Sequence, residues 1–481
     1  MKTLPKTSSK KKQRINRSVV SPEVTLLALE ERFAAGKALR QTVKRSEHGN
    51  YQPSPNRPDP ISILEAQAST RIPELIPIRY ARMLTSPFAF LRGSAAIMIQ
   101  DIAPAPTTGL TVQACGDMHV SNFGLFASAE RNLTFGINDF DETHPGAWEW
   151  DLKRLVASAN VAARFLGGDR DLCETAAREV VQSYRQHLRE YAEMGCLDLW
   201  YASIKEADIL EKLPPKYRKI AIQVMEKARS RTHLQVLDKM TDLLDNQHHI
   251  IEDRPLVVRD QTTRKGRPIA EALELFLQEY LASMGADRRF LMSQYRVLDV
   301  ARKVVGVGSV GTHCWVIYFQ GRDINDPLFL QVKEAQPSVL APYAKDYSKQ
   351  TLPDDNEGHR VVVGQRLIQG APDIFLGWGE QDGLHYYVRQ LRDMKGGVKL
   401  EPDKVQLSGF PAYCGLCGWA LALAHAKSGD AAMLSGYLGD NEALDDALVK
   451  FAQAYADQTE QDYDQLAAAA RTGRIPVASE F

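Results

Sequence analysis

Hydrophobic residues follow two different periods in two parts of the chain. Across residues 152–166 and 169–194 they recur every three or four positions, which is typical of helices with one buried face. Between residues 295 and 391 they alternate with polar residues, and many are β-branched, which predicts strands. The pattern therefore predicts an α+β protein with a large helical part and a smaller antiparallel β part.

Helical spacing extends well beyond these two segments. It is found in residues 21–44, 61–98, 197–252, 268–284, 356–369, 414–428 and 442–474. We therefore expect four regions along the chain, in which two helical segments form one lobe. They are a basic, largely disordered tail with one helix and a linker (1–60), a helical lobe (61–292), a small β lobe (293–394), and helices that complete the helical lobe (395–481).

The composition limits the class of protein. Lys and Arg number 59 against 60 Asp and Glu, a net charge of −1, so a nucleic acid is not an expected partner. No apolar run approaches the roughly 20 residues of a membrane span, and the N-terminus lacks the apolar core of a secretory signal. Six cysteines, scattered singly except for Cys414 and Cys417, fit a reducing cytoplasm. We expect that pair to be packing residues of a helix.

A short acidic segment, residues 115–155, concentrates the polar residues that could carry chemistry. Asp117, His119 and Asn122 fall on a loop, and a predicted strand over residues 133–137 delivers Asp139 and Asp141 at its end. Carboxylate and amide oxygens held in this way suit Mg²⁺, which usually takes one or two carboxylates together with phosphate oxygens. Loop Asp and Asn residues more often form turns and caps, but the ordered set is harder to explain in that way.

The spacing within this segment resembles that of the protein-kinase and aminoglycoside-phosphotransferase superfamily. Those enzymes have a catalytic-loop Asp, an Asn five residues later and a second metal-binding Asp after a strand. By this resemblance Asp117 orients or deprotonates the acceptor hydroxyl, with His119 beside it. Asn122 and Asp139 hold Mg²⁺, with Asp141 as a further candidate ligand. Asp151 resembles the Asp that opens the next helix and braces the catalytic loop.

A glycine-rich loop lies in the predicted β lobe. Gly306, Gly308 and Gly311 give the pattern G-x-G-x-x-G, with Ser309 among them. A dinucleotide-binding loop would need a helix directly afterwards, whereas the following residues have the pattern of a strand. The kinase loop sits between two strands, and its phosphate-binding lysine lies on the third, as Lys333 does here. Lys333 is therefore expected to contact ATP phosphates, although a plain hairpin with a glycine turn has the same pattern.

The order of these motifs is the reverse of that in kinases. Lys333 follows Asp139 by 194 residues (333−139), whereas kinases place the lysine first. We therefore expect a two-lobed, circularly permuted kinase-like fold, with the Lys333 ammonium within roughly 10 Å of an Asp139 oxygen in a closed form. Glu357, on a predicted helix, and Glu334 are candidate ion-pair partners of Lys333. Arg92, beside a glycine, is a candidate phosphate contact, although a surface or buried-pair arginine is the commoner case.

From about residue 60 to the C-terminus, the chain also resembles the bacterial family known as domain of unknown function 2252. The leading hypothesis is an enzyme that transfers phosphate from Mg²⁺-bound ATP to an unknown hydroxyl on a small molecule or protein. Nucleotidyl transfer would use the same parts, so this variant remains open. The alternatives are a non-catalytic nucleotide-binding regulator and a metal-dependent phosphoesterase that would use Asp117 and His119 without Lys333. The sequence does not indicate the acceptor or the oligomeric state.

Overall fold

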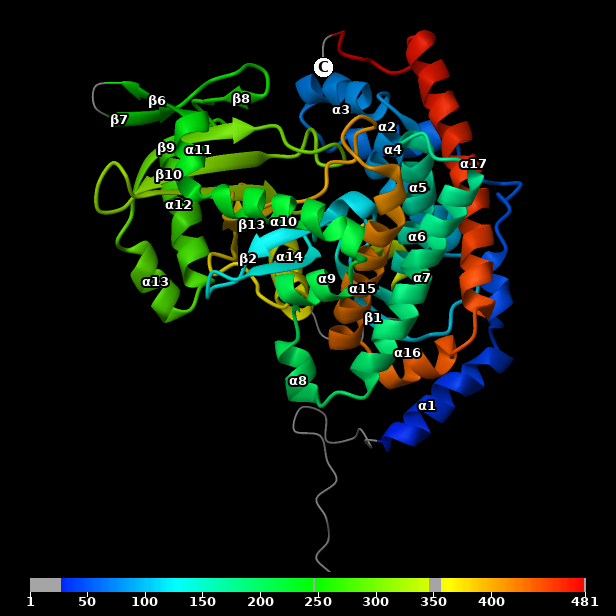
Figure 1. The fold of residues 1–481 in the computed structure, drawn as a ribbon. Coiled ribbons are helices and arrows are strands. Elements are labelled where there is room, and N and C mark those ends of the chain that lie inside the picture. The colour runs from blue at the N-terminus through cyan, green and yellow to red at the C-terminus, as the bar shows by residue number, and fades with distance from the viewer. Residues whose placement is uncertain (1–26, 245–246, 346–355, 480–481) are drawn as a thin grey trace, which may run out of the picture.

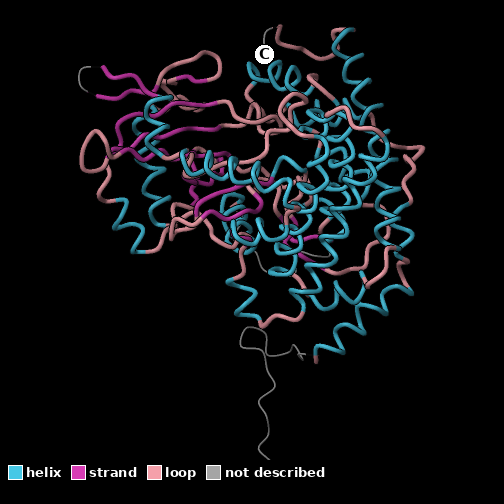
Figure 2. The backbone as a smooth tube through the Cα atoms, in the orientation of Figure 1, coloured by secondary structure: helices cyan, strands magenta, loops and turns pink. Residues whose placement is uncertain are grey.

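Helices fill one side of the molecule and an antiparallel sheet fills the other (Figure 1, Figure 2). The computed structural model describes residues 27–244, 247–345 and 356–479. The expected disordered tail, residues 1–20, lies outside the described residues. The protein belongs to the α+β class, as the two hydrophobic periods predicted.

A six-stranded antiparallel sheet runs in the order β12-β13-β11-β10-β9-β8 and is called the sheet region here. Its strands are β8 (Val257–Val258), β9 (Arg296–Lys303), β10 (Cys314–Gln320), β11 (Pro327–Glu334), β12 (Gly377–Gln381) and β13 (Leu384–Gln390). The pairing Cys314↔Lys333 fixes the register of β10 and β11. Because side chains alternate across a strand, this register puts Lys333, Gln331 and Phe329 on one face of the sheet.

Each face of the sheet is covered by a helix. Leu330 and Val332 point to the face covered by α12 (Ile269–Ala282), which is followed by α13 (Ala286–Met292). Phe329, on the opposite face, packs with Val236 and Leu237 of α11 (His233–Met240). Helix α14 (Glu357–Ile368) connects β11 to β12 and packs on β12 and β13. Burial on both faces explains why β10, in the middle of the sheet, contains no charged residue.

The helical region is built from both ends of the chain, with α7 packed against α15 at its centre. Gly418 of α15 allows this contact, because a Cβ there would lie 2.2 Å from the carbonyl oxygen of Val180. The helices before the sheet are α1 (Leu29–Ala38), α2 (Pro60–Ala68), α3 (Ile76–Met83), α4 (Pro87–Gly93), α5 (Ala95–Ile102), α6 (Trp148–Phe165), α7 (Arg170–Ala192), α8 (Cys196–Tyr201), α9 (Glu206–Lys212) and α10 (Pro215–Ser230). Those after it are α15 (Phe410–Ser428), α16 (Ala431–Leu438) and α17 (Ala443–Arg471).

Short strands frame the acidic segment inside the helical region. One pair is β1 with β4, and a second small sheet has the order β2-β3-β5. Their bounds are β1 (Thr111–Ala114), β2 (Phe123–Ala127), β3 (Leu133–Ile137), β4 (His144–Ala147) and β5 (Ile204–Lys205). The hairpin β2–β3 brings the residue before β2, Asn122, beside the residues after β3, where the Asn138 amide donates to the Asn122 carbonyl at 2.8 Å.

Two expectations about local structure were wrong. Residues 197–252 are not all helical, because β6 (Thr241–Leu244) and β7 (Gln247–Ile250) form a hairpin whose end is fixed by Asp299 accepting from the Ile250 amide at 2.7 Å. The pattern of residues 374–378 predicted a strand from residue 374, but β12 begins only at Gly377. In the expected linker at the end of residues 1–60, His48 is buried and bonds Tyr437 at 2.7 Å.

One helical stretch, Leu407–Ser428, is long and apolar enough to cross a membrane by length and composition alone, which corrects the expectation that no run approaches this length. About two thirds of it (67%) is buried within the protein, as expected for a core helix. Cys414 and Cys417 lie in this helix as buried free thiols, so they pack as predicted.

Candidate functional site

The loop after β1 is held in place by a buried carboxylate on the first turn of α6. Asp151 accepts from the backbone amides of Cys115 at 2.6 Å and Gly116 at 2.9 Å, and its Oδ2 lies 3.3 Å from Nε2 of His425. Gly116 has a φ of 79°, and a Cβ there would lie 2.6 Å from the carbonyl oxygen of Glu142. The brace expected from the resemblance is therefore present, and it fixes the loop that carries Asp117.

Asp117 projects from this loop and contacts two bases. Its Oδ1 accepts from Nε of Arg154 at 2.8 Å and also from Nη2 of the same guanidinium. Its Oδ2 lies 3.7 Å from Nε2 of His119. Arg154 is buried and also donates to the Leu91 carbonyl at 2.8 Å, so the position of its guanidinium is fixed. Asp117 keeps one oxygen accessible to a ligand, since its side chain is 23% exposed.

His119 is neutral at pH 7. Burial lowers the pKa of its imidazole to about 4, and the nearby guanidinium groups of Arg92 and Arg154 act in the same direction against the attraction of Asp117. Within the described part of the chain, Nδ1 of His119 has no hydrogen-bond partner. The imidazole can therefore serve as a neutral donor or acceptor beside Asp117.

Asn122 and Asp139 present oxygen atoms to the same cavity. The Asn122 side-chain amide donates to the Asp117 carbonyl at 2.7 Å, which leaves its Oδ1 as the atom open to a cation. The side chain of Asp139 is 38% exposed, although its Oδ1 atom is buried and accepts no hydrogen bond from the described residues. The described ranges contain no group of three His, Cys, Asp or Glu side chains that would hold a metal by itself. Two such oxygens fit Mg²⁺ bound together with phosphate, and do not form an all-protein site.

Lys333 reaches this cavity from the sheet. Its ammonium lies 2.5 Å from Oδ2 of Asp141 and 3.7 Å from Oδ1 of Asp139, so the expected proximity of Lys333 and Asp139 is confirmed. Burial opposes its charge, but the two carboxylates raise the pKa of Lys333 well above its usual value. In turn Lys333, with Arg389 and Lys395, lowers the pKa of Asp139 against the effect of burial.

The ion-pair partner of Lys333 was not predicted correctly. Glu334 instead pairs with His313 at 2.8 Å, and Glu357 pairs with Arg360. Asp141 is the partner, and its other oxygen accepts from the Tyr387 hydroxyl at 2.5 Å. Each oxygen of Asp141 therefore accepts one hydrogen bond, and the carboxylate neutralises the lysine.

Two cations behind Asp139 were missed. Arg389 donates to the Gln331 side chain and to the Asn138 carbonyl, both at 3.0 Å. The charge of Arg389, followed by burial, lowers the pKa of Lys395 to about 7. Arg389 lies two residues from Tyr387 on one strand, but only knowledge of the strand pairing would have placed either residue at the site.

The glycine-rich loop connects β9 to β10 and is hydrogen-bonded to the helical region. Gly306 and Gly311 have φ values of 67° and 92°, which favour glycine. The Gly306 carbonyl accepts from Arg82 at 2.6 Å, and the Gly311 carbonyl accepts from the Ile72 amide at 2.8 Å. A Cβ on Gly308 would lie 3.2 Å from the Arg92 carbonyl oxygen. The loop therefore lines the cavity and is held against the helical region.

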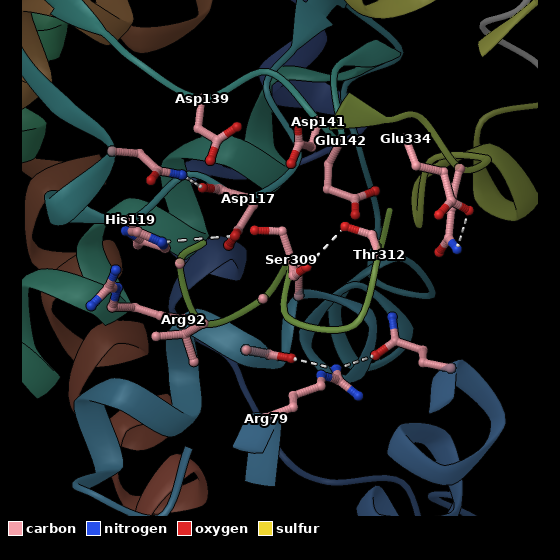
Figure 3. A pocket seen from close by; sticks show the side chains of 18 of the residues that line it. Arg79, Arg92, Asp117, His119, Asp139, Asp141, Glu142, Ser309, Thr312 and Glu334 are labelled. Carbon is pink, nitrogen blue, oxygen red and sulfur yellow. Dashed lines mark hydrogen bonds and ion pairs between the residues drawn. The ribbon is translucent and has the colours of Figure 1, made fainter. Parts of the chain in front are cut away.

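The resulting cavity has an acidic wall and a wall that contains arginines (Figure 3). Its lining residues with side-chain charge are Arg71, Arg79, Arg92, Asp117, Asp139, Asp141, Glu142 and Glu334. Gly306, Gly308 and Ser309 line it from the glycine-rich loop. Lys333 reaches the site through its ion pairs with Asp139 and Asp141.

Comparison with curated proteins and with solved structures gave no match. A protein-family model does match the chain over residues 71–469, a range that includes all the residues of the cavity except Gln67. That family is described as an uncharacterized protein conserved in bacteria, DUF2252. Because the match covers most of the sequence, this protein is a member of the DUF2252 family.

Proposed function

We propose that this protein is a phosphotransferase that uses Mg²⁺ and ATP and acts on a hydroxyl group of an acceptor. The observation that carries the proposal is the contact of Lys333 with Asp139 beneath a glycine-rich loop, although 194 residues (333−139) separate them in the chain. Phosphoryl transfer requires a lysine and a metal-binding carboxylate at one triphosphate.

The topology of the sheet supports a kinase-like interpretation. The glycine-rich loop joins β9 to β10, Lys333 lies on β11, and helix α14 follows. This is the order of the phosphate-binding elements in the kinase nucleotide lobe. The acidic loop precedes these elements in the chain instead of following them, so the proposal includes a circularly permuted, two-lobed kinase-like fold.

The geometry suggests a role for each residue. Asp117 would accept the hydroxyl proton as the acceptor oxygen bonds to phosphorus and the bond from phosphorus to the ADP oxygen breaks. Asn122 and Asp139 would hold Mg²⁺, which when bound neutralises charge on the phosphate oxygens. Lys333 would exchange part of its contact with Asp141 for a phosphate oxygen, and the backbone of the glycine-rich loop would cover the phosphates.

One observation favours a second candidate, a nucleotide-binding regulator without turnover. Val316 and Phe329 lie on the same sheet face as Lys333, and α11 covers this face through Val236 and Leu237. A base that extended along the sheet from phosphates at Lys333 would have to displace α11. A protein that seldom opens in this way would bind nucleotide weakly and turn it over slowly. The phosphoesterase alternative makes no use of Lys333 and gains nothing from its position.

The test is a thermal-denaturation titration with ATP, with Mg²⁺, and with both, followed by a transfer assay with γ-labelled ATP and a metabolite extract. We expect the largest rise in Tm with both ligands, because a ligand that binds only the native state stabilises it by mass action. Asp139→Asn should abolish the dependence on Mg²⁺, whereas Asp287→Asn, at a 71%-exposed carboxylate, should behave like the wild type. Absence of any response to Mg-ATP at millimolar concentration would contradict both candidates, and binding without transfer would favour the regulator.

A further inference from the structure

Three arginines form the wall of the cavity opposite the acidic loop, and none of them is used by the proposed chemistry. Arg71 precedes α3, Arg79 lies within α3, and Arg92 lies in the last turn of α4. All three line the same cavity, and Figure 3 shows Arg79 below the loop that carries Ser309 and Arg92 to the left of this loop, toward His119. They come from separate segments, so their convergence is a property of the fold and not of one helix face.

Arg79 is buried, Arg71 and Arg92 are half-buried, and all three are incompletely paired. Arg79 is 1% exposed, and its Nη2 donates to Gln67 at 2.9 Å and to the Gly93 carbonyl at 3.2 Å, while Nε and Nη1 have no partner among the described residues. Arg71 donates from Nη1 to the Val310 carbonyl at 2.5 Å, and the Nε atoms of Arg71 and Arg92 also lack partners within the described part of the chain. No carboxylate among the described residues forms an ion pair with any of the three.

An unpaired buried guanidinium is costly, because burial removes its hydration without supplying an acceptor. Burial, together with the charge of Arg71, lowers the pKa of Arg79 to about 9. An anion in the cavity would supply the missing acceptors. The planar guanidinium group suits phosphate and carboxylate oxygens in particular, since it can donate two parallel hydrogen bonds.

Two neighbouring features suit the same kind of ligand. Helix α5 begins at Ala95, which lines this cavity, and the amino end of a helix favours negative charge. The Gly308 backbone lies against Arg92, so the glycine-rich loop and the arginine wall meet at one point. Asp117 lies between this wall and Asp139, and its charge partly offsets the effect of burial on Arg92.

We propose that Arg71, Arg79 and Arg92 bind an oxyanion, phosphate or carboxylate, carried by the acceptor, so that the acceptor is an acidic hydroxyl compound. The assignment of the bound molecule as the acceptor rests on the proposed function, whereas the anion site itself does not. The anion would hold the acceptor at the wall opposite Asp139 and direct its hydroxyl to Asp117.

The experiment measures the affinity of the full-length protein for inorganic phosphate by calorimetry, with and without saturating Mg-ADP. We expect phosphate to bind in both conditions, because the nucleotide would occupy the Lys333 end of the cavity. Arg79→Met and Arg92→Met should each weaken phosphate binding at least tenfold and leave the affinity for Mg-ADP within about twofold. Arg189→Met, at a 55%-exposed arginine of α7, serves as the matched control. Two variants are used so that misfolding of one, seen by circular dichroism, leaves the other informative.

Each outcome is decisive. Phosphate binding that is absent, or that survives both substitutions, overturns the anion site. Competition between phosphate and Mg-ADP, with both affinities lowered by the arginine variants, assigns the arginines to the nucleotide and overturns the acceptor assignment. Phosphate binding that depends on the arginines, in a protein that does not bind Mg-ADP, keeps the anion site and rejects the phosphotransferase function.

Discussion

The two ends of the cavity differ in whether their charged side chains are paired within the protein. At the lysine end, Lys333 contacts Asp141 and Asp139, and the Tyr387 hydroxyl completes the contacts of Asp141. At the arginine end, two nitrogen atoms of Arg79 have no partner among the described residues, although the side chain is almost fully buried. The charge of Lys333 is therefore paired with carboxylates without a ligand, whereas the charge of Arg79 is not.

This difference matters for binding energy. A ligand at the lysine end must replace existing contacts, so it gains only the difference between new and old ion pairs. A ligand at the arginine end supplies acceptors to donors that lack a partner among the described residues. It therefore removes the desolvation penalty that these donors carry in the ligand-free protein. We therefore expect substitutions at the two ends to affect stability in opposite ways.

The largest effect is expected at Asp117, where the two ends meet. Asp117→Asn should lower turnover by about a hundred- to ten-thousand-fold, because the amide cannot accept the hydroxyl proton. Nucleotide affinity should stay within about twofold, since Asp117 is not proposed to contact the phosphates. Steady-state kinetics combined with calorimetry measure both quantities. Equal losses of turnover and nucleotide affinity would show that Asp117 acts at the metal end instead.

The second largest effect is expected at the lysine end of the cavity. Lys333→Met should lower the free energy of unfolding by about 2 kcal/mol, less than for a fully buried pair because Asp141 and Asp139 are 27% and 38% exposed. Adding Asp141→Asn should restore part of this loss, because the unpaired carboxylate is then removed. Urea denaturation of the two single variants and the double variant measures the coupling. Strictly additive changes would mean that the ion pair contributes nothing to stability.

A third effect depends on pH. Unfolded His119 takes up its proton near pH 6.5 but the folded protein does so only near pH 4, so the unfolded state gains the proton first as pH falls. The free energy of unfolding should therefore be unaffected above pH 6.5 and decrease below it, by about 2 kcal/mol at pH 5. His119→Gln should flatten this dependence relative to the wild type in urea titrations. A parallel pH dependence in both proteins would mean that the imidazole is not held neutral.

The smallest effect is expected at the arginine end of the cavity. Arg79→Met should change the free energy of unfolding by less than about 1 kcal/mol, or raise it, because a buried charge without a counter-ion is replaced by an apolar chain of similar length. The lost hydrogen bonds to Gln67 and Gly93 work against this gain. Chemical denaturation beside the Lys333→Met variant gives the contrast directly. A loss above about 3 kcal/mol would mean that Arg79 is a structural residue and that the two ends do not differ.

What the sequence predicted was determined by local spacing. Asp117, Asn122 and Asp139 could be found because a loop and a hairpin fix their separation along the chain. Lys333 could be found because three consecutive strands and a glycine-rich loop fix its place on the sheet. The lysine partner could not be predicted, because Asp141 and Lys333 meet only through the packing of the two regions. Arg92 could be named as a candidate phosphate contact, but its convergence with Arg71 and Arg79 could not be predicted for the same reason. The β6–β7 hairpin likewise depends on Asp299 of a distant strand.

The brace of the acidic loop has a consequence for how the protein is made. Asp151 is fully buried against His425, which also bonds Tyr184 of α7 at 2.8 Å. During synthesis, Asp151 leaves the ribosome 274 residues before His425 (425−151), and the whole sheet region is translated between them. Contacts of such long sequence separation form late. Until they form, apolar core residues stay exposed and the chain is prone to misfold. The acidic loop can therefore become rigid only when α15 has been made, so that a chain interrupted before residue 410 would present its carboxylates on an unsupported loop.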